Sequence, residues 1–185
     1  MKKNTKKFLI YIAIGALVIW SIALFFIDVT VFIETIGITN AYLSLFLVAT
    51  VTGTSFLTSA SFYAVFVAYA SSGVLDPYLM GLVGGGGMAI GDSIYFFISK
   101  KTIDVMELEN KKVYQKIYLF VEKLPHWGVY IFTFLYAAFA PIPNDILMIT
   151  LGALKFKYSR IIPIIVVGNI TLLTLIALGI FHITS

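Results

Sequence analysis

Apolar residues fill most of this chain, and a few polar clusters divide it into stretches of roughly bilayer length. Residues 8–27 are almost all apolar, and at 1.5 Å per residue they make a helix about 30 Å long, which matches the hydrocarbon core of a bilayer. They are too many for the apolar region of a signal peptide, so we expect a retained helix. Residues 78–99 and 161–181 repeat the pattern. The sequence therefore predicts three membrane-spanning helices.

Two further apolar regions, residues 41–72 and 127–156, fit neither one span nor two and are interrupted in the middle. Small polar residues between Gly53 and Ser61 break the first. Pro141 and Pro143 break the second, because proline removes a backbone donor and restricts the residue before it. Two half-length arms that meet at a polar tip are typical of a re-entrant hairpin. We expect both regions to enter the bilayer and leave it on the same side.

The basic residues support this arrangement. Three spans and two hairpins place the basic clusters at residues 2–7, 100–123 and 155–160 on one side of the membrane, which the positive-inside rule assigns to the cytoplasm. The predicted fold is an all-α integral membrane protein with a single membrane domain over residues 1–185. It is an inverted repeat of re-entrant helical hairpin plus transmembrane helix, preceded by one N-terminal transmembrane helix. We expect a prokaryotic plasma membrane and a cytoplasmic N-terminus.

Residues 100–125 form the only strongly polar segment. Its apolar residues Val113, Ile117, Val121 and Leu124 recur at helical spacing, and its lysines lie off that stripe. This pattern predicts an amphipathic helix in the headgroup plane, in contact with anionic lipid at the cytoplasmic face. An ordinary exposed connector helix is the alternative.

Composition narrows the classes of function. The chain is 60% hydrophobic and 12% charged, against about 25% charged in a typical soluble domain. The net charge of +4 suits attraction to an anionic leaflet. The sequence has no basic face with interleaved aromatic residues, so binding to nucleic acid is not expected. The chain has no cysteine, and its two histidines lie far apart in the sequence. We therefore expect no metal and no cofactor. With no G-x-S-x-G motif and no magnesium-binding Asp cluster, we do not expect an enzyme.

Two acids lie where a charge is costly. Asp92 falls inside a predicted span and Asp145 at the break of the second hairpin. A charged residue at membrane depth costs at least about 2.5 kcal/mol and usually faces a wet cavity. Alternatively, Asn144 or Asp145 only caps the second arm, and Asp92 only forms a buried hydrogen bond to Asn169 or a tyrosine.

The glycine run 84–87 lies near the middle of its predicted span. Consecutive glycines allow another helix to approach closely, and Gly81, Gly85 and Ala89 form a face of small residues. Local unwinding beside a substrate path is the alternative.

A family resemblance connects these features. Residues 84–95, GGGGMAIGDSIY, resemble the glycine-rich segment of the DedA superfamily, also called VTT-domain or SNARE-associated Golgi proteins. Residues 138–145, AFAPIPND, followed by Gly152 and by Gly168 with Asn169, look like the second hairpin of that family. The resemblance covers roughly residues 41–181. It implies lipid translocation, as phospholipid scrambling or as transport of a lipid-linked carrier such as undecaprenyl phosphate.

This chain departs from the family at two places. The acid and the proline turn common in the first hairpin are replaced by hydroxyl residues at 55–61, and the arginines of bacterial members by Ala138 and Asn144. A mechanism that couples an acid to an arginine is therefore not expected here.

The predicted function is movement of a phospholipid or a lipid-linked carrier between leaflets. An ion- or proton-coupled transporter of a small solute and a non-transporting scaffold are the alternatives, and homo-oligomerisation is left open. The residues expected along the substrate path are Ser55, Ser59, Ser61, Asp92, Tyr95, Asn144, Asp145 and Asn169. Those expected to gather headgroups are Lys155, Lys157 and Arg160, and those with a structural role are Gly91, Pro141, Pro143, Gly152 and Gly168.

Overall fold

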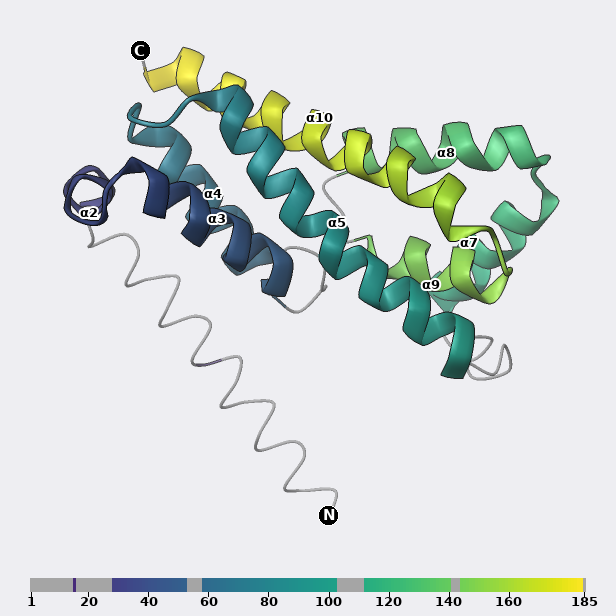
Figure 1. Ribbon diagram of the computed structural model, residues 1–185. Helices are drawn as coiled ribbons and strands as arrows, with labels where there is room; N and C mark the ends of the chain where they lie inside the picture. Colours follow the sequence, from purple (N-terminus) through teal and green to yellow (C-terminus); the bar gives the residue numbers. More distant parts are fainter. Residues whose placement is uncertain (1–14, 16–27, 53–57, 103–111, 141–143, 185) are drawn as a thin grey trace.

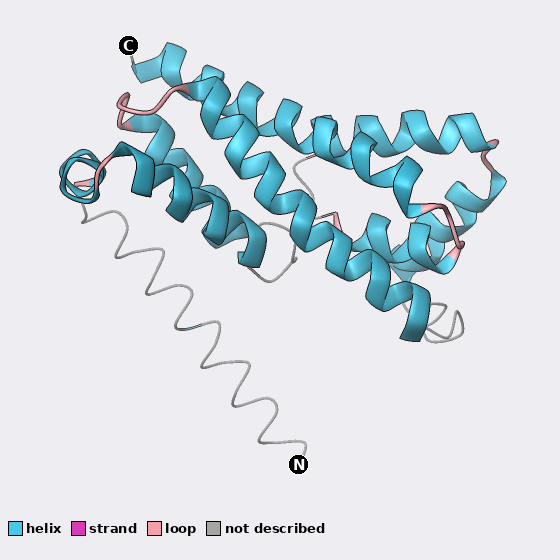
Figure 2. Ribbon diagram, in the orientation of Figure 1, coloured by secondary structure: helices cyan, strands magenta, loops and turns pink. Residues whose placement is uncertain are grey.

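The computed structural model describes residues 28–52, 58–102, 112–140 and 144–184, together with the isolated Gly15. Over these residues the chain is helical apart from short connections (Figures 1 and 2). The predicted all-helical class is therefore confirmed for the part of the chain that the structure describes.

Two long helices form the centre of the molecule. Helices α5 (Pro77–Thr102) and α10 (Tyr158–Thr184) pack side by side along their length (Figure 1). Both are long and apolar enough to cross a membrane, over Pro77–Ser99 and Tyr158–Ile183. They coincide with two of the three predicted spans, and the predicted span 8–27 lies outside the described residues.

Glycines bring the central helices into close contact. A Cβ added to Gly85 would lie 2.6 Å from the backbone nitrogen of Ile170 in α10, and Gly81 likewise faces Thr174. Early residues of α5 thus meet late residues of α10, so the two helices are antiparallel. Helix α5 is continuous through the glycine run. The packing interpretation of this run is confirmed, and the alternative of local unwinding is wrong.

The first broken apolar region forms helices α3 (Ile38–Thr52) and α4 (Ser59–Ser71). At 15 and 13 residues, they are about 20–23 Å long, which is shorter than a bilayer core of about 30 Å. Helix α3 packs along α5, and α4 contacts α10. The predicted break falls partly on residues 53–57, which lie outside the described residues.

A short helix that the sequence did not predict precedes this pair. Helix α2 (Val29–Ile36) begins after Asp28, whose Oδ1 accepts hydrogen bonds from the backbone N–H groups of Thr30 and Val31. It ends at Gly37, whose φ of 84° is favourable only for glycine. Helices α2 and α3 meet at 109°, and together they are apolar enough to form one bent span as an alternative to a re-entrant pair.

The second broken region forms helices α8 (His126–Phe139) and α9 (Asp145–Ala153). Helix α8 packs along α10, and α9 packs along α5. Pro141 and Pro143 lie outside the described residues. Each central helix therefore contacts one member of each short helix pair.

Two predicted structural glycines lie at these contacts. A Cβ added to Gly152 would lie 2.7 Å from the carbonyl oxygen of Phe96, and one added to Gly168 would lie 2.5 Å from Cβ of Ala137. Gly91 is buried within α5. These positions allow α9 to approach α5 and α10 to approach α8.

The polar segment contains helix α7 (Lys112–Lys123). Ile117, Val121 and Leu124 of the predicted apolar stripe pack into a core cluster that includes α9 residues, and Phe120 remains exposed. Much of the apolar stripe thus packs against other helices, whereas a helix lying free in the headgroup plane would leave its whole stripe in contact with lipid. The interfacial position of α7 stays a prediction, and residues 103–111 lie outside the described part.

Adjacent glycines in α5 offer a matched test of this packing. Gly85→Ala should lower the free energy of unfolding by about 1–3 kcal/mol, because the added methyl group overlaps the backbone of α10. Gly86 has nothing within 4 Å of an added Cβ, so Gly86→Ala should be neutral or stabilise by up to about 1 kcal/mol. Unfolding in detergent measures both, and equal effects would contradict the described contact.

Candidate functional site

Three polar side chains from separate elements meet in the interior. Asp92 comes from the middle of α5, Asn144 from the residue before α9, and Asn169 from the middle of α10. Their exposed fractions are 0%, 3% and 0%. All three were predicted path residues, and we refer to them as the polar triad.

Hydrogen bonds connect each pair within the triad. Nδ2 of Asn144 donates to Oδ2 of Asp92 at 3.1 Å and to Oδ1 of Asn169 at 2.8 Å. Nδ2 of Asn169 donates to the same Oδ2 of Asp92 at 2.8 Å. The other carboxyl oxygen, Oδ1, is buried and has no hydrogen-bond partner among the described residues. The carboxyl group of Asp92 thus has two amide donors on one oxygen only.

The triad lies well inside both central helices. Asp92 precedes Ser99, the end of the apolar part of α5, by about 10 Å of helix, and Asn169 follows the start of α10 by about 16 Å. The start of α10 lies beside this part of α5, since the ring centroids of Tyr158 and Phe97 lie 4.6 Å apart. The triad therefore lies one-third to one-half of the way along each helix, counted from Ser99 in α5 and from Tyr158 in α10.

The structure decides between several sequence-based alternatives. The alternative considered for Asp92 was a buried hydrogen bond to Asn169 or a tyrosine, and the bond to Asn169 is present. Asn144 occupies the cap position of α9, but its side chain makes no capping hydrogen bond because it turns towards the central helices. The capping role considered for Asn144 is therefore wrong. Asp145 instead satisfies a backbone donor in the first turn of α9, because its Oδ1 accepts a hydrogen bond from the N–H of Ile146 at 2.8 Å.

Two further ionisable groups lie near Asp92. Its carboxyl group interacts electrostatically with that of Asp145, which is 8% exposed, and with the phenol of Tyr63 in α4. Tyr63 was not predicted, because nothing in the sequence distinguishes it from other aromatic residues in apolar helices. Because Tyr63 belongs to α4, the first helix pair also contributes an ionisable group that interacts with Asp92.

The remaining predicted path residues are less closely associated. Ser59 and Ser61 are buried in α4, and Ser55 lies outside the described residues. Tyr95 packs against the core cluster around Phe96, which places it among apolar side chains.

The predicted headgroup-gathering residues line one small pocket. Lys155, Lys157 and Arg160 surround a cavity of about 190 Å³ together with His126 and Tyr130. We call this cavity the basic pocket. Sequence reasoning missed His126 and Tyr130, because they join the pocket only through the packing of α8 on α10.

The end of α9 determines the position of Lys155. Its φ of 58° is unusual for a residue other than glycine. The N–H of Phe156 donates to the carbonyl of Leu151 at 3.1 Å, and the N–H of Lys155 donates to the carbonyl of Gly152 at 3.0 Å. These two bonds form a Schellman motif, which satisfies the last carbonyl groups of the helix. The chain then turns directly into α10.

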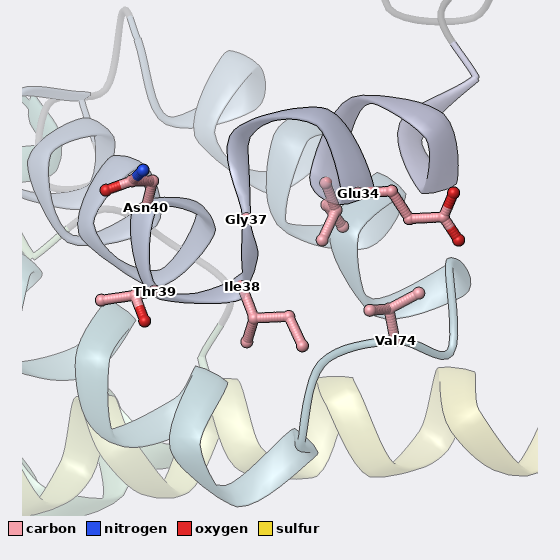
Figure 3. A pocket seen from close by; sticks show the side chains of 7 residues that line it. Glu34, Gly37, Ile38, Thr39, Asn40 and Val74 are labelled. Carbon is pink, nitrogen blue, oxygen red and sulfur yellow. The ribbon is translucent and has the colours of Figure 1, made fainter.

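A separate cavity of about 680 Å³ lies at the bend between α2 and α3 (Figure 3). Figure 3 shows Glu34 and Val74 on one side, Thr39 and Asn40 on the other, and Ile38 between them. This cavity shares no lining residue with the triad or the basic pocket.

Within the described residues, no group of three or more His, Cys, Asp or Glu side chains is placed to bind a metal ion. Comparison with protein-family models, curated proteins and solved structures finds no match to this chain.

Two asparagines provide a test of the triad. Asn144→Ala should lower the free energy of unfolding by about 2–4 kcal/mol, because it removes two buried hydrogen bonds and one of the two donors to Asp92. Asn40→Ala removes one exposed hydrogen bond, to the carbonyl of Ile36, and should cost about 1 kcal/mol or less. Thermal or denaturant unfolding in detergent checks this, and a loss for Asn144→Ala no larger than for Asn40→Ala would contradict the triad.

Proposed function

We propose that this protein moves phospholipids between the two leaflets of a membrane. The observation that carries the proposal is the triad, in which a buried carboxyl group connects the start of α9 to both central helices. A charged residue retained at membrane depth is costly and usually serves transport. The resemblance of residues 84–95 and 138–145 to the DedA superfamily, stated above from the sequence, points to the same function.

The packing pattern supports an inverted repeat as part of this proposal. In the first unit, α3 packs on its own following span, α5, and α4 on the other span, α10. In the second unit, α8 packs on its own span, α10, and α9 on α5. If each short pair is a re-entrant hairpin, the two enter from opposite faces and their tips approach the midplane, where such repeats have their substrate sites.

The triad would act as the closed gate of the path. Because Asp92 and Asn144 are buried, a headgroup reaches the carboxyl group only when the tip of the second hairpin separates from the central helices. Each hydrogen bond contributes about 0.5–3 kcal/mol net, so breaking the bonds of Asn144 is within thermal reach. The headgroup then passes the polar tip residues while the acyl chains stay in lipid.

The charges favour one class of headgroup. Asp92 and Asp145 interact electrostatically near the tip, and no arginine lies in the matching positions of the sequence. Two carboxyl groups attract a cation, so a zwitterionic or amine-bearing headgroup suits the gate better than a bare polyprenyl phosphate. The basic pocket would attract the phosphates of anionic lipids at the cytoplasmic face.

Proton- or ion-coupled transport of a small solute is the second candidate. It is favoured by the buried Oδ1 of Asp92, which lacks a partner among the described residues and could take up a proton. Dependence on a gradient separates the two candidates.

Leaflet exchange in reconstituted vesicles tests the proposal. A fluorescent phosphatidylethanolamine analogue, reduced from outside by an impermeant reagent, should exchange without a pH gradient. Asp92→Asn retains the shape of the side chain but removes the charge, and it should slow exchange by about tenfold or more. Glu122→Gln, at an exposed position of α7, should leave the rate unchanged.

Two outcomes would contradict the proposal. Exchange no faster than in protein-free vesicles would exclude lipid translocation under these conditions, and exchange only with a pH gradient would favour coupled transport. An Asp92→Asn protein that folds and exchanges lipid at the parental rate would remove the triad from the path.

A further inference from the structure

The basic pocket shares one lining residue, Tyr130, with an apolar groove. The groove has a volume of about 490 Å³ and lies between α8 and α10, where Ile131, Phe134, Pro163, Ile164 and Val167 line it. Tyr130 lines both the groove and the basic pocket. One side chain therefore lies where a strongly polar site and an apolar site meet.

The chemistry of the pocket suits a phosphate group. Lys155, Lys157 and Arg160 supply three cations, and its lining residues in the described chain include no carboxylate. Guanidinium and ammonium groups form charge-assisted hydrogen bonds to phosphate oxygens. Nη1 of Arg160 lies 3.5 Å from the hydroxyl of Tyr130, a long contact that directs the guanidinium towards the junction with the groove.

The groove suits a hydrocarbon chain. Its lining is apolar apart from the hydroxyl of Tyr130, and Ile131 and Val167 are exposed large hydrophobic residues on its two sides. A small inorganic anion would need only the three cations and would make no use of the apolar groove beside them. A phosphate group joined to an acyl chain satisfies both parts of the surface at once.

We propose that the basic pocket and the groove together bind one anionic phospholipid, with its phosphate among Lys155, Lys157 and Arg160 and an acyl chain between α8 and α10. The cation of a zwitterionic headgroup would be repelled by this pocket, so the site selects a lipid other than the one proposed to pass the gate. About 14 Å of helix separates Arg160 from Asn169, which also places the site apart from the triad.

Such a lipid would act as a brace. It contacts α8, the α9–α10 connection and α10 at the same time, so it would fasten the second helix pair to the last helix. A ligand that binds only the folded state raises its stability by mass action.

Binding can be measured on the full chain in a nonionic detergent, which has no charged membrane surface. Phosphatidylglycerol is added, and retained lipid is counted by native mass spectrometry alongside the shift in melting temperature. We expect one tightly retained phosphatidylglycerol per chain and a higher melting temperature. Phosphatidylcholine with the same acyl chains and inorganic phosphate alone should give neither effect.

A pair of matched double variants tests the pocket. Lys155→Gln with Lys157→Gln should weaken phosphatidylglycerol binding at least about tenfold. Lys116→Gln with Lys123→Gln removes the same charge from exposed positions of α7 and should weaken it less than about twofold. Equal losses in the two proteins would overturn the site in favour of diffuse attraction to a basic protein.

A second matched pair tests the groove. Val167→Trp should fill the groove and weaken phosphatidylglycerol binding, whereas Leu175→Trp, at an exposed position further along α10, should not. Unchanged binding by Val167→Trp would overturn the acyl-chain assignment. Because binding is measured at equilibrium in detergent, a failure here is distinct from a failure of lipid exchange in vesicles.

Discussion

A carboxyl group buried in an apolar bundle must be given hydrogen-bond donors, and this requirement organises the centre of the structure. Asp92 is fully buried, and its two donors come from Asn144 and Asn169. Leaving a buried charge without partners costs several kcal/mol. The second helix pair is therefore held to the central helices at Asn144, the residue that precedes α9.

The donors can reach Asp92 only because the surrounding helices approach closely. Gly85 allows α10 to contact α5, and Gly152 allows α9 to contact α5. Side chains at these positions would separate the helices and lengthen the hydrogen bonds of the triad. The glycines distributed along the sequence thus serve the same site as the three polar residues, through packing rather than through chemistry.

The central helices and the arms of both broken regions could be predicted, because each depends on the local hydrophobic pattern. The hydrogen bond of Asp92 could be foreseen only as an alternative with two possible partners, Asn169 or a tyrosine, and the structure has the one to Asn169. The direction of the Asn144 side chain could not be predicted, because capping and tertiary hydrogen bonding compete and only packing decides. The same holds for the basic pocket, which depends on α8 placing His126 and Tyr130 beside α10. Helix α2 was missed although Asp28 is a typical cap, since its residues looked like a connection between apolar regions.

We propose that two helical hairpins enter the membrane from opposite faces and meet the central helices in its interior. The chain contains no cysteine, so single cysteines can report the side directly through an impermeant maleimide, applied to intact cells and to inverted vesicles. Cysteines at Asn40 and Ser71 flank the first hairpin, and cysteines at His126 and Lys157 flank the second. The account predicts that the first two react only from outside and the last two only from the cytoplasmic side. Reaction of either pair from opposite sides would show that its hairpin crosses the membrane and would contradict the account.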